Sequence, residues 1–232
     1  MINKKVLHFS SLDSTNEYAK SILNKVSRGT VIVADTQSAG KGRLGRHWYS
    51  PKGGLWFSVI LKPKNPALMS LAMGIGVCDV LNALGFKICI KWPNDILIGS
   101  KKIAGILTEI IDEAIIVGFG INLNIKTFPD DLKGKATSTM IESGENFTCQ
   151  KILNLILENI EQRYIMTEHN IEKLLDDWRH YSTTIGKKVQ IEMPNSIIEG
   201  VAVDIDKDGA LLVKTDGGVM QKIFAGDCIC CT

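Results

Sequence analysis

Apolar and polar residues follow two different periods along the chain. Apolar side chains after Ser14 recur every three to four positions, and Glu17 follows Ser14 at capping-box spacing, so this pattern predicts a helix that begins here. Three further helical patterns follow, at residues 67–84, 149–168 and 171–181. Runs rich in β-branched residues predict strands at residues 30–34, 55–61, 87–92, 96–98, 103–111 and 114–123.

Turn signals indicate how these strands connect. Asp112 and Glu113 form a tight connection between two strands, which favours an antiparallel run over residues 96–123. Residues 128–147 are polar and are predicted to be irregular. From residue 185 onward only short strands separated by turns remain, at residues 187–192, 197–206, 210–215 and 219–224. We therefore expect two domains, 1–184 and a small C-terminal β-barrel at 185–232.

Composition narrows the class of protein. The 232 residues are 45% hydrophobic and carry a net charge of +2, which excludes a disordered chain and argues against a dedicated nucleic-acid binder. No segment approaches the roughly 18 consecutive apolar residues of a membrane span, and the N-terminus does not read as a signal peptide. The six cysteines are interpreted as reduced thiols, so we expect a cytoplasmic protein that does not bind membranes.

The segment between residues 37 and 54 is rich in glycine and basic residues. Its GKGRLG sequence matches the dinucleotide-binding G-x-G-x-x-G, but a strand follows it instead of the helix that such a site needs. Lys41, Arg43 and Arg46 stand among glycines that let the backbone approach an anion, and Trp48 can cover an aromatic ligand. The loop fits a phosphate or carboxylate site about as well as a solvated basic surface.

Two later segments add weaker signals. KWPND ends a predicted strand at residues 91–95, and Gly105 within the next strand leaves room for a ligand or for backbone. Two more glycines and an asparagine follow in the GFGIN sequence at residues 118–122. Each segment alone also fits an ordinary turn or a bulged strand end.

Taken together and in this order, these motifs resemble biotin–protein ligase, also called biotin–[acetyl-CoA-carboxylase] ligase. The resemblance rests on residues 14–16, 37–48, 91–95, 102–107 and 118–122. It implies an α+β fold, with a mixed, largely antiparallel sheet flanked by helices as in class II aminoacyl-tRNA synthetases, plus an SH3-like barrel. Lys41 departs from the family's usual arginine, and about a dozen residues before Ser14 leave no room for a helix-turn-helix domain. We therefore expect the monofunctional type, which does not bind DNA.

The resemblance implies a reaction and a set of site residues. Biotin and ATP, with Mg²⁺, give biotinyl-5′-AMP, and a lysine of a biotin carrier domain then takes the biotin. The residues implied to bind biotin are Ser14, Thr15, Asn16, Gln37, Gly40, Lys41, Gly42, Arg43, Lys102 and Gly105. Those implied to contact ATP or the adenylate are Arg43, Arg46, Trp48, Asn94 and Asn122. Arg43, Lys102 and Asp95 are the implied catalytic residues.

Some roles and alternatives stay open at this level. Asp95 would orient the acceptor lysine or help to place Mg²⁺, and no metal-ligand set is expected in the protein itself. A lipoate or octanoate ligase of the same superfamily is the nearest alternative, although polar groups such as Thr15 and Gln37 favour biotin's ureido ring. A non-enzymatic module with a basic loop is a second alternative. The sequence does not decide between a monomer and a homodimer.

Overall fold

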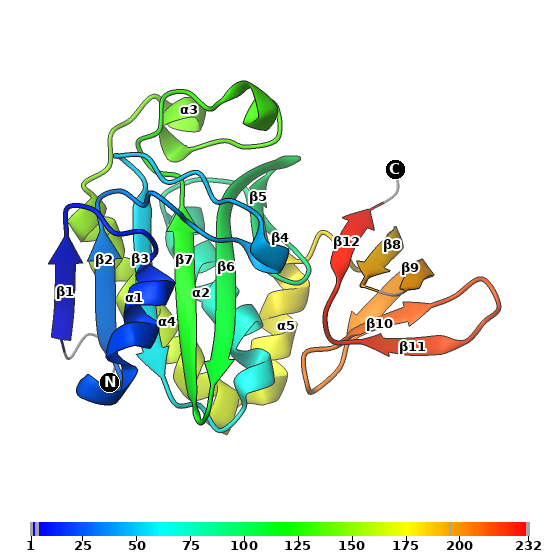
Figure 1. The fold of residues 1–232 in the computed structure, drawn as a ribbon. Helices are drawn as coiled ribbons and strands as arrows, with labels where there is room; N and C mark the ends of the chain where they lie inside the picture. The colour runs from blue at the N-terminus through cyan, green and yellow to red at the C-terminus, as the bar shows by residue number, and fades with distance from the viewer. Residues whose placement is uncertain (1, 3–4, 195, 231–232) are drawn as a thin grey trace.

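A seven-stranded sheet forms the centre of the N-terminal domain in the computed structural model, which describes residues 2, 5–194 and 196–230 (Figure 1). Its strand order is β1-β2-β3-β7-β6-β5-β4. β1 and β2 run parallel, and every other neighbouring pair is antiparallel, as predicted. The strands are β1 (Lys5–Phe9), β2 (Thr30–Ala34), β3 (Leu55–Leu61), β4 (Ile88–Lys91), β5 (Asp95–Ile98), β6 (Lys101–Ile111) and β7 (Ala114–Ile121).

Helices cover both faces of this sheet. α1 (Thr15–Ile22) lies on one face, while α2 (Met69–Ala83), α4 (Cys149–His169) and α5 (Ile171–Tyr181) lie on the other (Figure 1). The segment Pro66–Ala83 is long and apolar enough to cross a membrane by length and composition, but 67% of it is buried inside the protein. It is the core helix of this fold, packed between the sheet and α4.

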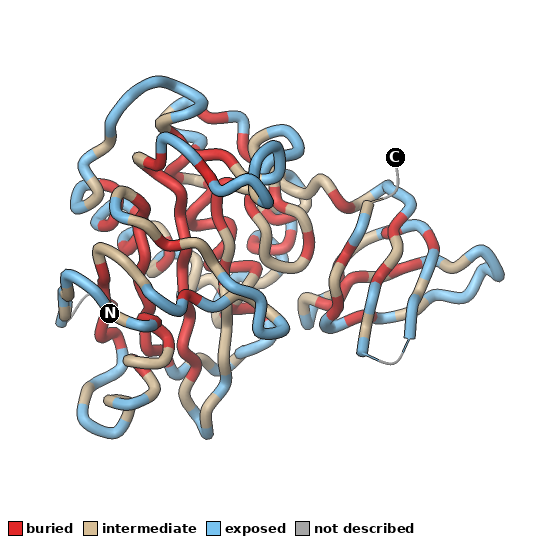
Figure 2. The backbone as a smooth tube through the Cα atoms, turned by 45° about the horizontal axis from the view of Figure 1, so that its top comes forward, coloured by how far each residue is buried: buried red, intermediate tan, exposed pale blue. Residues whose placement is uncertain are grey.

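Strand β3 is buried along its whole length because both of its faces are covered (Figure 2). Leu55, Phe57 and Val59 join the large core shared with α2 and α4. The alternate residues Ser58 and Ile60 face α1, where Ile60 packs in a smaller apolar cluster. The face under α1 therefore holds both an apolar patch and a polar patch, and the polar patch belongs to the site.

The C-terminal domain is a five-stranded antiparallel sheet with the order β11-β10-β9-β8-β12. Its strands are β8 (Lys188–Met193), β9 (Ser196–Ile205), β10 (Leu211–Lys214), β11 (Met220–Ile223) and β12 (Asp227–Cys230). It follows directly after α5, and Arg179 of α5 holds Asp204 of β9 at 2.7 Å. The helices end with α5 at Tyr181 and strands follow from Lys188, while the domain boundary near Thr184 stays a prediction.

Three elements were not expected from the sequence pattern. β1 and β12 are short edge strands, and β1 alternates between exposed and half-buried residues without a strong apolar run. α3 (Thr139–Ser143) lies in the segment predicted to be irregular, where the Ser138 side chain caps it by accepting from the Ile141 amide. Tertiary pairing and a single cap determine these elements, so a pattern of apolar spacing does not reveal them.

Candidate active site

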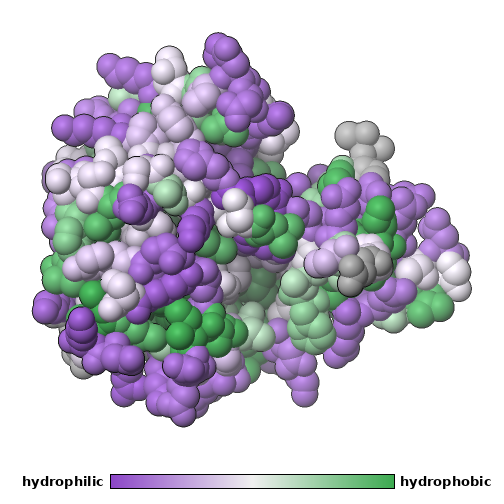
Figure 3. All heavy atoms as spheres, viewed as in Figure 1, coloured by the Kyte–Doolittle hydropathy of each residue, from purple (hydrophilic) through white to green (hydrophobic). Residues whose placement is uncertain are grey.

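A cavity of about 410 Å³ opens where the N-terminal domain meets the C-terminal sheet. Figure 3 shows the hollow between the two domains on the face that carries α1. The predicted site residues that line the cavity are Ser14, Thr15, Asn16, Gln37, Lys41, Gly42, Arg43, Arg46, Trp48, Asn94, Asp95, Lys102, Gly105 and Asn122. Residues from five separate segments thus converge on one space.

Gly40 is the one predicted residue that does not line this cavity. A Cβ added there would lie 2.5 Å from the Trp48 carbonyl oxygen and 2.6 Å from Ser50 Oγ. The Trp48 amide donates to the Gly40 carbonyl at 2.8 Å. Gly40 therefore closes the base of the loop, where only a glycine fits.

A buried polar network forms one end of the cavity. The Ser14 side chain caps α1, which places Thr15 and Asn16 in the first helical turn. Gln37 Oε1 accepts from the Thr15 amide at 2.8 Å, and Ser58 Oγ lies 2.7 Å from Thr15 Oγ1 and 2.6 Å from Asn16 Oδ1. Thr15 and Asn16 are almost fully buried, so these fixed dipoles suit a ligand with its own donors and acceptors.

Two glycines of β7 make room for this network and for Trp48. A Cβ on Gly118 would lie 2.3 Å from Asn16 Oδ1, and one on Gly120 would lie 2.3 Å from Trp48 Nε1. In the sequence, both glycines also fit an ordinary bulged strand end, so they pointed to no particular role. The absence of side chains at these two positions lets Asn16 and Trp48 lie directly on the sheet.

The indole of Trp48 occupies space beside Gly105. A Cβ on Gly105 would lie 3.1 Å from Trp48 and 3.1 Å from Lys102 Cε, so the room predicted for a biotin chain is filled by these side chains in this structure. Trp48 Nε1 is buried without a hydrogen-bond partner among the described residues. An unpaired buried donor is costly, and a ligand acceptor in the cavity would satisfy it.

Lys102 lies at the centre of the cavity wall. Its Nζ is 2.5 Å from Asp95 Oδ1 and 4.9 Å from the centre of the Trp48 ring. Asp95 in β5 pairs with Gly105 in β6, and this register brings the carboxylate to the lysine. The ion pair holds the ammonium group in place before any anion binds.

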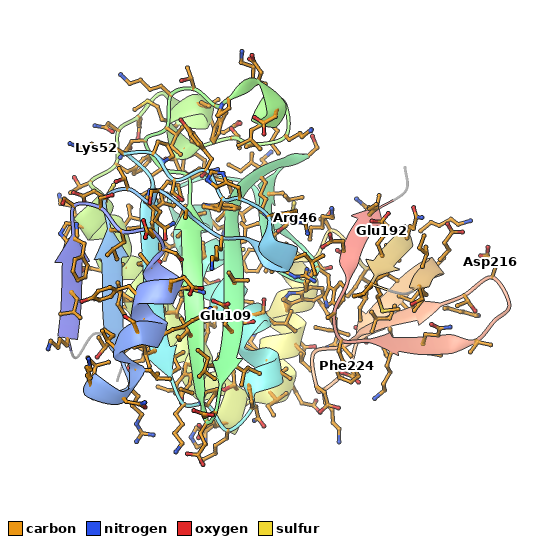
Figure 4. All side chains as sticks on the ribbon, viewed as in Figure 1. Arg46, Lys52, Glu109, Glu192, Asp216 and Phe224 are labelled. Atoms are coloured by element: carbon orange, nitrogen blue, oxygen red, sulfur yellow. The ribbon has the colours of Figure 1, made fainter. Side chains whose placement is uncertain are left out.

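The glycine loop brings Arg43 and Arg46 to the C-terminal domain. Arg43 Nη2 donates to the Gly226 carbonyl at 2.9 Å, and Arg46 Nη2 lies 2.6 Å from both carboxylate oxygens of Asp227. Figure 4 shows Arg46 at the side of the loop that faces Glu192 of the C-terminal sheet. Asp227, which was not expected at the site from the sequence, therefore forms ion pairs with both arginines predicted to contact ATP.

Burial lowers the pKa of the Arg43 guanidinium, while the neighbouring charges of Asp227 and Asp95 raise it. The group stays charged, because even a lowered arginine pKa lies far above neutral pH. A half-buried cation of this kind interacts more strongly with an anion than an exposed one does.

The two predicted asparagines are already held by the backbone. Asn94 Nδ2 donates to the Ile106 carbonyl at 2.8 Å, and Asn94 Oδ1 accepts from Arg43 at 3.2 Å. Asn122 Nδ2 donates to the Thr137 carbonyl at 2.9 Å. Asn94 thus orients Arg43, and Asn122 secures the segment that bears an aromatic and aliphatic cluster with Trp48, Tyr49, Trp56, Ile125, Phe128, Leu132 and Ala136.

Among the described residues, no group of three or more histidine, cysteine, aspartate or glutamate side chains could hold a metal ion. Three carboxylates nevertheless line the cavity, from Asp95, Glu192 and Asp227. Glu192 and Asp227 come from the C-terminal sheet, together with Cys228 and Ile229. Only the three-dimensional contact of the two domains reveals them.

Two parts of the chain are similar to known protein families. Residues 8–125 match the Biotin/lipoate A/B protein ligase family, and residues 184–230 match the Biotin protein ligase C terminal domain. The matched segments contain every residue of the predicted site.

Two curated relatives show the extent of the similarity. The Bifunctional ligase/repressor BirA of Bacillus subtilis is 37% identical over 98% of this chain and 74% of its own length. The Biotin--[acetyl-CoA-carboxylase] ligase of Mycobacterium tuberculosis is 32% identical over 87% of this chain and 79% of its own length.

A solved structure has the same fold. The biotin protein ligase from Aquifex aeolicus in complex with biotin and ATP superposes with a TM-score of 0.89 and 31% identity. The match covers 97% of this chain and 98% of that one, so both domains are shared.

Proposed function

The chain belongs to the biotin/lipoate A/B protein ligase family, and on that premise we propose that its cavity joins biotin to a lysine of a carrier protein with ATP. It is a ligase, and biotin and ATP are its substrates. The observation that carries the proposal is the shared cavity itself. A buried polar network around Thr15 lies at one end, and Lys102 and Arg43 contribute positive charge to the same space.

In the first step, a carboxylate oxygen of biotin bonds to the α-phosphorus of ATP. The bond from that phosphorus to the α–β bridging oxygen breaks, and pyrophosphate leaves with the negative charge. Lys102 and Arg43 stabilise the charge that develops on the phosphate, and Trp48 covers the adenine beside the aromatic cluster. The protein supplies position and charge, and no side chain forms a covalent intermediate.

In the second step, the carrier lysine amine attacks the activated carbonyl carbon. The amide bond forms, the bond from carbon to the AMP oxygen breaks, and the nitrogen releases a proton. Asp95, already 2.5 Å from Lys102, is our candidate to orient the incoming amine. Its place between a fixed cation and the cavity supports that role.

Mg²⁺ fits the chemistry of this cavity as a companion of ATP. The ion usually keeps several waters and binds through one or two carboxylates plus substrate phosphates, and Asp95 and Asp227 offer such oxygens. When bound, it would offset phosphate charge. This chain's own contribution is to hold the two carboxylates beside Lys102, Arg43 and Arg46.

A lipoate or octanoate substrate is the alternative within the same family. The network of Thr15, Asn16 and Gln37 argues against it, because a plain acyl chain offers no donor or acceptor to the polar groups at this end of the cavity. ATP–pyrophosphate exchange measured with biotin and with lipoate distinguishes them. Exchange that depends on lipoate alone would overturn the biotin assignment.

We also propose the setting in which the enzyme acts. The acceptor is a biotin carrier domain of a carboxylase, the protein works in the cytoplasm, and it neither binds DNA nor enters a membrane. Incubation with ATP, Mg²⁺, biotin and a carrier domain should raise the mass of the carrier by one biotinyl group. A carrier variant without the acceptor lysine is the control, and an unmodified wild-type carrier would contradict the proposal.

A further inference from the structure

A chain of alternating charges runs from the buried end of the cavity to the glycine loop. Glu109 Oε1 lies 2.7 Å from Lys20 Nζ, and Lys20 Nζ lies 2.7 Å from Glu17 Oε1. Glu17 Oε1 in turn lies 2.9 Å from Lys41 Nζ on the loop. The four groups come from β6, α1 and the loop, and neither Glu109 nor Lys20 was expected at the site from the sequence.

The first member of this chain touches a ligand-facing residue. Asn16 Nδ2 donates to Glu109 Oε2 at 2.7 Å, while Asn16 Oδ1 lies 2.6 Å from Ser58 Oγ. Figure 4 shows Glu109 on β6, on the face of the sheet that α1 covers. Because an ionised carboxylate only accepts hydrogen bonds, Glu109 determines which end of the Asn16 amide carries the nitrogen.

This orientation decides what Asn16 offers to a ligand. The amide oxygen keeps a second lone pair, and the side chain rests on Gly118, which leaves it no room to rotate freely. A cyclic urea such as that of biotin presents N–H donors that need an acceptor in a fixed place. If the Asn16 amide were turned by 180°, its NH₂ group would face the N–H donors of the urea, and no hydrogen bond would form.

Lys20 forms an ion pair with Glu109 in a half-buried position. The exposed fractions of the two side chains are 26% and 28%, so solvent screens this pair less than a surface pair. Burial, the largest single effect, lowers the pKa of Lys20, but its hydrogen bonds to Glu109 and Glu17 outweigh this and raise the pKa overall. Lys20 thus stays positive and gives the carboxylate a permanent counter-ion.

We propose that Glu109 is a positioning residue that fixes the Asn16 amide for recognition of the biotin ring, with Lys20 as its counter-ion. The proposal rests on the biotin-ligase function argued above and adds a specificity element to it. Glu109 acts through Asn16 and stands behind it on β6, outside the residues that line the cavity.

Two substitutions at one position separate the hydrogen bond from other effects. Glu109→Gln keeps an oxygen that can accept from Asn16, and Lys20 keeps its contact with Glu17, so the Kd for biotin should stay within about threefold of wild type. Glu109→Leu removes the acceptor, and the Kd should rise about tenfold to a hundredfold. Titration calorimetry with biotin measures both, with Glu113→Gln, an exposed glutamate paired with Lys62, as the matched control.

The apparent KM for ATP in pyrophosphate exchange provides the second readout. It should remain unchanged in all three variants, since Glu109 does not line the ATP side of the cavity. Wild-type biotin affinity in Glu109→Leu would overturn the proposal, and so would equal losses in Glu109→Gln and Glu109→Leu. A parallel rise in the KM for ATP would indicate a general structural role instead. Absence of biotin binding by the unmodified protein would refute the proposed function itself.

Discussion

Single residues in this site are held in place by close packing and by ion pairs. Asn16 packs against the backbone of Gly118, and Trp48 packs against that of Gly120. Asp95 forms an ion pair with Lys102. Lys41 Nζ contacts Glu17 as a point charge, and such a contact does not need the guanidinium fork.

Replacing the central cations tests the proposed chemistry at this scale. Arg43→Ala and Lys102→Ala should each lower biotinyl-AMP formation by about 100-fold or more, because each removes charge aimed at the reacting phosphate. Pyrophosphate exchange gives the rate, and circular dichroism should show an intact fold. Lys101→Ala, the exposed neighbour in the same strand, is the control. Near-wild-type adenylate synthesis by both variants would remove these residues from the mechanism.

Cys230 should be unusually reactive for a cysteine of this chain. A hydrogen bond from Cys228 and the nearby charges of Lys91 and Lys187 outweigh burial and lower its pKa to about 6. Its rate of alkylation should therefore rise through pH 6 and level off by pH 7, whereas burial raises the pKa of Cys78 and should protect it. Mass mapping after short iodoacetamide pulses between pH 5 and 8 measures this.

The lowered pKa of Cys230 also links to stability with a definite sign. The folded state favours the thiolate, so the contribution to the free energy of unfolding is present above the unfolded thiol's pKa, about 8.5. It is lost as the pH falls through about 6. In the alkylation experiment, a rate of Cys230 modification that keeps rising up to pH 8 would contradict the low pKa.

At the scale of elements, α2 and α4 meet at a glycine. A Cβ on Gly76 would lie 2.8 Å from Ile160 Cγ2 and 3.0 Å from Ile160 Cα, so backbone as well as side chain would have to move. Gly74 lies two residues earlier in the same helix. A Cβ added there would lie 3.7 Å from Ile106 Cδ1 and 3.8 Å from Ile90 Cδ1, which is ordinary van der Waals contact. Both glycines therefore belong to the same apolar helix, but only Gly76 lacks space for an added methyl group.

This pair of glycines gives a stability prediction. Gly76→Ala should lower the free energy of unfolding by about 1–3 kcal/mol through overpacking. Gly74→Ala should be neutral or raise it by up to about 1 kcal/mol, because alanine favours the helix and fits. Urea unfolding of both variants measures the difference. Equal stabilities for the two would show that α4 yields easily to the added methyl group.

Elements with strong local signals could be predicted from the sequence. The capped start of α1, the buried run of β3 and the Asp112–Glu113 connection all follow from nearby residues, and all are present. β1 and β12 could not be predicted, because partners far along the chain stabilise these short edge strands. Asp227 was missed for the same reason, since 181 residues separate it from Arg46.

For the molecule as a whole, the contact between the glycine loop and the C-terminal sheet is the feature that completes the site. Asp227 engages Arg46 through both carboxylate oxygens and lies 3.8 Å from Arg43. It presents to these guanidinium groups a negative charge and two acceptor oxygens, the groups with which a phosphate also binds arginine. Without nucleotide, this carboxylate keeps the loop against the second domain.

Removing that carboxylate should loosen the loop. In Asp227→Asn, trypsin should cleave after Arg43 or Arg46 roughly fivefold faster than in wild type, because a bidentate pair worth about 1 kcal/mol is lost. Timed digestion followed by mass spectrometry measures the rate. Asp216→Asn, whose pair with Lys188 spans 3.8 Å at an exposed turn, should cleave as wild type does. An unchanged rate in Asp227→Asn would mean that the loop is held by its own backbone.

The place of residues 227–229 in the cavity wall also has a consequence for biosynthesis. These residues leave the ribosome after the whole N-terminal domain, so the large sheet and its helices can fold while one wall of the pocket is still being translated. At that stage the chain already has the buried polar network around Thr15, but it lacks Asp227 and the C-terminal sheet to which Asp227 belongs. A nascent chain is therefore expected to bind biotin before it binds nucleotide, and to begin making adenylate only once β12 has emerged from the ribosome and paired with β8.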